Sequence, residues 1–175
     1  KNWTVNKVVQ HLHGSDRMAV LSLKDPEGFK QTIKQPDRVR SNMNPEQAGT
    51  GLVQDWWQYF EEMAELLGAS DPKRRLPWFG PDMGVMMFTT ARQMETWAHG
   101  QEIFDLFEVA RINSDRIRNI AVIGVKTYGW TFVNRGQQPP GPAPYVELTA
   151  PSGEVWSFNE YSEESFVEGS AGEFC

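Results

Sequence analysis

Three residues of this chain have types and spacing suited to binding a metal ion: His11, Glu95 and His99. Glu95 and His99 are four positions apart, so on a helix both would project from one face and could converge on one ion. His11 and His13 are two positions apart, roughly 200° around a helix, and cannot both reach that ion. A set of His11, Glu95 and His99 would leave a coordination position open, as catalytic metal sites do.

The chemistry of these side chains limits the metal but does not select one. Imidazole and carboxylate ligands suit zinc, nickel or iron(II). The spacing alone leaves a simpler interpretation open, in which Glu95 and His99 form an exposed pair on a helix surface. His11 would then be a solvated side chain beside an apolar face. We assign no metal role to His13, which must be structural or exposed.

Two further residues share the helix face of Glu95 and His99. Steps of three, four and seven residues place Arg92 and Glu102 in the same quadrant of the helix, while apolar residues occupy another. We expect Arg92 and Glu102 to orient the metal ligands or the substrate.

Other catalytic patterns are absent from the sequence. It contains no Gly-rich phosphate loop, no Gly-x-Ser-x-Gly elbow and no dinucleotide fingerprint. The single cysteine, Cys175, has no histidine beside it, which argues against a nucleophilic thiol.

Composition limits the class of protein. The 175 residues, 39% of them hydrophobic and seven of them tryptophan, can bury one substantial core. A net charge of −6 without a dense basic block argues against a nucleic-acid partner. No apolar run of about 18 residues is present, so we expect no membrane span. One cysteine allows no intrachain disulfide, and we predict a cytoplasmic protein.

Apolar spacing predicts a mainly α protein. Thr4 is a candidate N-cap for the first helix, and Gly68 is predicted to end the second. Three prolines in 24–50 predict a long loop with one short helical piece, and a further loop is expected over 72–81. The predicted helices span about 5–23, 52–67, 85–108 and 115–135, the last capped by Ser114 and closed by Gly136.

The C-terminal part has a different pattern. Residues 137–144 contain four prolines and predict a linker. Alternating residues at 145–149 and 155–158 predict a β-hairpin, which must pack on other elements. We therefore divide the chain into a helical domain at 1–136, the linker, and a small α/β segment at 145–175. The chain begins with Lys1, and residues 164–175 have the pattern of an unfinished element, so we expect both ends to be truncated.

Two motifs make the chain resemble a known family. They are Asn2-Trp3-Thr4-Val5 followed by Val9-Gln10-His11-Leu12, and the stretch from Met94 to Gln101 that contains Glu95 and His99. Together they resemble the DinB-like metal-binding superfamily, in the branch of mycothiol-dependent maleylpyruvate isomerase. The resemblance implies an up-down four-helix bundle and implies that His11, Glu95 and His99 are the metal ligands.

The resemblance extends along most of the chain. The segments 77–81, 129–136 and 146–153 are similar to a subgroup of metal-binding proteins of unknown reaction. In that subgroup, the part after the linker resembles a small domain called wyosine-base-formation-like by sequence analogy. No tRNA chemistry is attached to that label.

The resemblance also implies an activity. We expect zinc or nickel to bind a low-molecular-weight thiol such as mycothiol, for an isomerase or S-transferase reaction on a small-molecule substrate. One alternative is hydrolysis by metal-activated water, and another is a non-enzymatic bundle that binds a ligand or partner and is braced by the metal. We expect no nucleic acid and no membrane as partners, and we include a homodimer among the assemblies considered.

Overall fold

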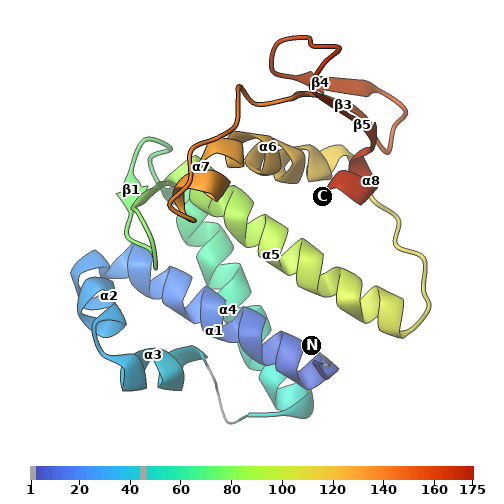
Figure 1. Ribbon diagram of the computed structural model, residues 1–175. Coiled ribbons are helices and arrows are strands. Elements are labelled where there is room, and N and C mark those ends of the chain that lie inside the picture. Colours follow the sequence, from blue (N-terminus) through green and yellow to red (C-terminus); the bar gives the residue numbers. More distant parts are fainter. Residues whose placement is uncertain (1–2, 44–46) are drawn as a thin grey trace. The chain divides into compact units, whose positions relative to one another are not determined.

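The computed structural model of the protein describes residues 3–43 and 47–175 (Figure 1). Asn2, from the first motif, and Pro45, from the predicted loop, lie outside the described residues. The fold is mainly α, with a small sheet near the C-terminus. None of the described helices is long and apolar enough to cross a membrane.

The chain forms two compact units, Lys1–Ile103 and Phe104–Cys175. This division differs from the boundary that the proline-rich stretch at 137–144 suggested. That stretch contains neither helix nor strand, as expected, but the helical segment before it belongs to the second unit.

Three long helices dominate the first unit: α1 (Val5–Lys24), α4 (Gly49–Ala69) and α5 (Val85–Leu106), whose last residues pass into the second unit. The prediction of these helices is confirmed, and so is the cap of α1, where the Thr4 side chain accepts a hydrogen bond from the Lys7 amide. The prediction for Gly68 is wrong, because α4 continues through it to Ala69.

The segment predicted as a loop contains two short helices, α2 (Pro26–Ile33) and α3 (Pro36–Met43). Each begins with one of the prolines that suggested a loop. Proline is tolerated in the first helical turn because the amide hydrogen it lacks has no partner there. Asp25 caps α2 by accepting from the Gly28 amide. The loop after α4 holds a short antiparallel pair, β1 (Arg75–Leu76) and β2 (Met83–Gly84).

The core of the first unit lies between α1, α4, β1 and α5. Partly buried rings, among them Tyr59, Phe60 and Trp78, pack against it. Because residues of α1 and α5 are joined in one apolar cluster, polar side chains elsewhere on those helices can be held in fixed positions. The cluster consists of Ala19, Val20, Leu23, Met63, Leu67, Leu76, Val85 and Phe88.

In the second unit, the long helix predicted for 115–135 is divided into η1 (Asp115–Ile117), α6 (Arg118–Lys126) and α7 (Tyr128–Val133). The break is at Thr127, whose backbone is not helical and whose hydroxyl donates to the carbonyl oxygens of Ile123 and Gly124. Side-chain hydrogen bonds of this kind compete with regular helix geometry. Ser114 precedes η1 but makes no side-chain cap. Gly136, with a φ of 67°, follows α7 as predicted.

The predicted hairpin is confirmed and is part of a larger sheet. β3 (Tyr145–Thr149) pairs antiparallel with β4 (Val155–Phe158), placing Leu148 opposite Trp156. A further strand, β5 (Phe166–Ser170), runs parallel to β3 on its other side, and the short helix α8 (Ala171–Phe174) follows it. The strand order is β4-β3-β5, so the hairpin belongs to a larger sheet, as the marginal stability of a lone hairpin requires.

Contacts within the second unit explain why η1 and α6 belong with the sheet. The Asp115 carboxylate accepts from the Ser152 amide, in the turn between β3 and β4. The Arg118 guanidinium lies 5.7 Å from the ring centre of Trp156. These contacts cross the proline-rich stretch, which is a surface connection inside one unit.

Candidate metal centre

The fold brings His11, Glu95 and His99 together. His11 lies on α1, beside the buried residues Val8, Val9 and Leu12, and the other two lie one turn apart on α5. Candidate ligand atoms of the three side chains all lie within 4.8 Å of one another. Among the described residues, no other three histidine, cysteine or acidic side chains gather in this way.

The distances fit two imidazoles and a carboxylate around one ion. Oε2 of Glu95 lies 3.2 Å from Nε2 of His11 and 3.6 Å from Nε2 of His99. Ligands at about 2.0–2.2 Å from a tetrahedral ion would be separated by about 3.3–3.6 Å. Both distances from Glu95 are therefore close to the spacing that zinc requires.

Glu95 is suited to supply the negative charge. The hydrogen bond from His11 lowers the pKa of its carboxyl group, burial raises it, and the positive charge of Arg92 lowers it further. The net direction is downward, so Glu95 is ionised at neutral pH. The side chains of His11, Glu95 and His99 remain 26%, 33% and 21% exposed, which leaves the site open to a small molecule.

Glu102 contacts one of the histidines. Its Oε1 lies 2.9 Å from Nδ1 of His99, so a proton on Nδ1 is donated to the carboxylate. That tautomer leaves the lone pair on Nε2, the atom that faces Glu95. A carboxylate in this position would fix the ring and increase the basicity of its other nitrogen.

Trp3 packs against both histidines, a contact that sequence reasoning did not predict. Its ring stacks on His99 with centroids 5.3 Å apart and planes at 12°, and it lies 5.2 Å from His11 in a tilted arrangement. The two imidazoles are themselves 4.6 Å apart. Trp3 stands immediately before the N-cap Thr4 and belongs to the first of the two motifs, and these two facts were the available signals.

Arg92 lies on the same helix as Glu95 but is directed into the core. Its side chain is 5% exposed and forms an ion pair with Asp16 of α1, which is fully buried. Nε and Nη2 of Arg92 donate to Oδ1 of Asp16 at 3.3 and 3.0 Å, and Nε1 of Trp56 donates to Oδ2 at 2.9 Å. Burial raises the pKa of Asp16, while Arg92 and Trp56 oppose this effect. The Arg92 guanidinium is therefore held in the core against Asp16.

His13 lies apart from the three-residue cluster. It is buried, its ring packs edge-on against Tyr59 at 5.3 Å, and its Nδ1 has no hydrogen-bond partner. Burial is the first cause that lowers its pKa, followed by the charge of Arg17. Of the two roles expected for His13, structural or exposed, the structure shows the structural one.

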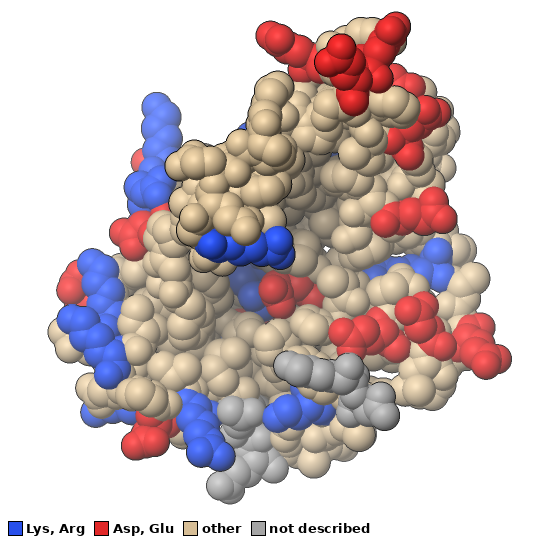
Figure 2. All heavy atoms as spheres, in the orientation of Figure 1, with Lys and Arg blue, Asp and Glu red and all other residues tan. Residues whose placement is uncertain are grey.

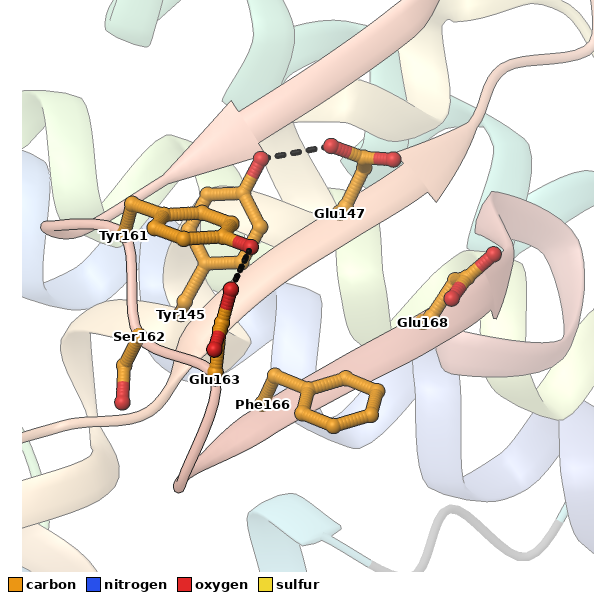
Figure 3. A pocket seen from close by; sticks show the side chains of 7 residues that line it. All are labelled: Tyr145, Glu147, Tyr161, Ser162, Glu163, Phe166 and Glu168. Atoms are coloured by element: carbon orange, nitrogen blue, oxygen red, sulfur yellow. Dashed lines mark hydrogen bonds between the residues drawn. The ribbon is translucent and has the colours of Figure 1, made fainter.

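The second unit contains a cavity of about 310 Å³ on the sheet, which sequence reasoning also did not predict (Figure 3). The Tyr145 hydroxyl donates to Glu147 at 2.5 Å, and the Tyr161 hydroxyl donates to Glu163 at 3.3 Å. Figure 2 shows acidic side chains gathered over this sheet. The lining residues are Tyr145, Glu147, Tyr161, Ser162, Glu163, Phe166 and Glu168.

Comparison with known families places the N-terminal part of the chain in one family. Residues 1–104 match the family model described as the mycothiol maleylpyruvate isomerase N-terminal domain. This stretch covers more than half of the chain and includes all three clustered residues. The chain belongs to this family. The match supports the resemblance drawn from the two motifs, and it ends one residue beyond the first compact unit.

Curated relatives extend the similarity to the second unit without naming a reaction. Two proteins of Mycobacterium tuberculosis, from two strains and both called uncharacterized, are each 35% identical to the chain over 180 residues. The similarity covers 99% of this chain and 70% of each relative. No solved structure matches the chain.

Proposed function

We propose that the protein binds one divalent metal ion through His11, Glu95 and His99, and that it serves as a metal- and thiol-dependent isomerase or S-transferase. The observation that carries the proposal is the convergence of Nε2 of His11, Oε2 of Glu95 and Nε2 of His99 from two helices. Membership in the family supports a metal and a mycothiol-type thiol as the chemistry of this site.

Each residue has a distinct part in the proposal. The two Nε2 atoms would supply neutral lone pairs, and Glu95 would supply the single negative charge, leaving a doubly charged ion with net positive charge. Glu102 would hold the proton on Nδ1 of His99 and so keep Nε2 free for the ion. Three protein ligands would leave a position for an exogenous molecule.

Bound at this site, zinc or nickel would stabilise the thiolate form of a small thiol at neutral pH, ready to add to an electrophilic substrate. The partly exposed side chains of the three residues provide access for such a thiol. Trp3 would offer an apolar surface beside it.

Four further expectations from the sequence belong to the proposal as well. They are the up-down four-helix bundle, the wyosine-base-formation-like character of the C-terminal part, a cytoplasmic location and a homodimer. The three long helices α1, α4 and α5 within the described first unit are compatible with the bundle.

The first experiment is metal analysis of the purified protein, followed by titration of the chelator-treated protein with zinc and with nickel. We expect about one equivalent of metal per chain. His11→Ala and His99→Ala should each remove most of the binding, whereas Lys24→Ala, on the far end of α1, should not. A folded, metal-free preparation that binds neither zinc nor nickel would contradict the proposal.

The second experiment separates the proposed reaction from its alternatives. The zinc-loaded protein is titrated with mycothiol, and turnover of electrophilic substrates is measured with and without the thiol. Saturable binding that depends on zinc, with turnover only when thiol is present, is expected. Turnover without thiol would instead indicate hydrolysis by activated water, and a bound ion without an exchangeable water would indicate a bracing role.

A further inference from the structure

A buried polar network lies next to the candidate metal centre and joins three helices. Asp16 comes from α1, Trp56 from α4 and Arg92 from α5. Both oxygens of the Asp16 carboxylate have partners, two donors of Arg92 on Oδ1 and the indole N–H of Trp56 on Oδ2. The ion pair is almost completely removed from solvent, with side-chain exposures of 5% and 0%.

The Asp16–Arg92 ion pair and the candidate ligands lie on the same two helices, α1 and α5. Asp16 follows His11 by five positions on α1, and Arg92 precedes Glu95 by three on α5. Since His11 faces Glu95 and Asp16 faces Arg92, the two helices run in opposite directions at this point. At a rise of about 1.5 Å per residue, the ion pair lies about 5–8 Å along the helices from the ligands.

A buried ion pair is weak evidence for stability, because desolvation of both charges offsets their attraction. Its best-attested use is to select one register between packed elements, since a shift of either helix would leave a charge buried and unpaired. Apolar contacts alone would tolerate such a shift more readily. The Arg92 guanidinium is further confined by Trp78, whose ring centre is 6.0 Å away.

We propose that Asp16 and Arg92, with Trp56, are positioning residues that fix the axial register of α1 against α5 and thereby the spacing between His11 and the Glu95/His99 pair. The inference rests on the proposed metal site. A slip of one residue along either helix would move His11 by about 1.5 Å relative to Glu95, enough to break coordination.

The test compares a double variant, Asp16→Leu with Arg92→Met, with the parent protein. The double change removes both charges at once and leaves neither one buried alone. Folding of the metal-free protein is followed by far-UV circular dichroism and thermal unfolding. Zinc affinity is measured by competition with a chelator, and the visible spectrum of bound Co²⁺ reports the ligand geometry.

We expect the double variant to fold but to bind zinc at least tenfold more weakly, with an altered Co²⁺ spectrum. The matched control is Glu62→Gln, which breaks the more exposed ion pair between Lys24 of α1 and Glu62 of α4. Its zinc affinity should stay within twofold of the parent's. A folded double variant with the parent's zinc affinity and Co²⁺ spectrum would overturn the inference.

Conservative variants decide the matter should the double variant fail to fold. Asp16→Glu keeps the negative charge but lengthens the side chain that bridges the two helices. Arg92→Lys keeps the positive charge but replaces the two donor nitrogens, Nε and Nη2, with one. The inference predicts weaker zinc binding and a changed Co²⁺ spectrum in both. Unchanged values in both would overturn it. If the parent itself binds no metal, the proposed function fails; if the parent binds and these variants bind equally well, only the register inference fails.

Discussion

Glu102 accepts a hydrogen bond from Nδ1 of His99 at 2.9 Å, and Nε2 of the same ring faces Glu95 at 3.6 Å. The His99 ring is therefore hydrogen-bonded on one side to the carboxylate of Glu102, three positions later on α5. Its other ring nitrogen faces Glu95. Sequence spacing placed Glu102 on the same face of the helix as His99. The structure shows which atom it contacts.

This contact predicts the effect of Glu102→Gln. The amide removes the charge that holds the Nδ1 proton, so the ring loses orientation and basicity, and zinc affinity should fall by about 10- to 100-fold. Competition with a chelator at neutral pH measures the change. Glu108→Gln, an exposed carboxylate beyond the end of α5, is the control. Equal zinc affinity in the parent and in Glu102→Gln would show that Glu102 does not contribute to metal binding.

Glu95→Gln should have a larger effect than Glu102→Gln, because it nearly preserves shape while removing the only anionic member of the cluster. Zinc at a hundredfold excess over its dissociation constant stabilises a folded protein by about 2.7 kcal/mol, which corresponds to roughly 5–10 °C in Tm for a protein of this size. We expect Glu95→Gln to lose this increment and keep its helical content. Thermal unfolding with and without zinc measures the increment, and far-UV circular dichroism measures the helical content. If Glu95→Gln binds zinc as tightly as the parent, Glu95 is not a metal ligand and only forms an exposed pair with His99.

The metal-free protein should depend on pH through Glu95. Its pKa lies below the ordinary value of 4.5, first because of the hydrogen bond with His11. A lowered pKa in the folded state means that ionised Glu95 stabilises the fold above about pH 4.5, and that this stabilisation is lost as pH falls through the lowered value. Urea unfolding between pH 3 and 7 should show parent and Glu95→Gln converging toward low pH. A constant difference across this range would refute the assignment.

His13→Ala should separate stability from metal binding. His13 is buried against Tyr59 and lies outside the cluster, so its truncation should cost about 1–3 kcal/mol of unfolding free energy. Zinc content of the folded variant should equal the parent's. Urea unfolding and metal analysis of one preparation test both statements. Loss of zinc from folded His13→Ala, with retention in His11→Ala, would show that the wrong histidine of α1 was assigned to the site.

Trp3 should report metal binding by fluorescence. Its ring stacks on His99 at 5.3 Å, so an ion with a partly filled d shell, such as Co²⁺ or Ni²⁺, should quench its emission. Trp3→Phe should lose most of the quenching while retaining the ion. The control is Trp57→Phe, an exposed indole on α4, which should keep the quenching. Full quenching in Trp3→Phe would place the ion elsewhere.

The sequence by itself determined the helices and the candidate ligands. Apolar residues at three- and four-residue steps specified α1, α4 and α5, because helical periodicity is a local property. The same periodicity placed Glu95, His99 and Glu102 on one face, and the motifs around His11 added the third candidate. Prolines misled the prediction at α2 and α3, since a proline that begins a helix and one that prevents a helix look alike in sequence.

Only the tertiary structure decided which distant residues meet. Separations of 84 positions between His11 and Glu95, and of 76 between Asp16 and Arg92, carry no local signal. Helical periodicity placed Arg92 beside the ligands, and packing directed it instead to a buried carboxylate on another helix. The burial of His13, the stacking of Trp3 and the pairing of β5 with β3 arise in the same way. Each depends on contacts between elements, and their energies are fixed only when the whole chain is packed.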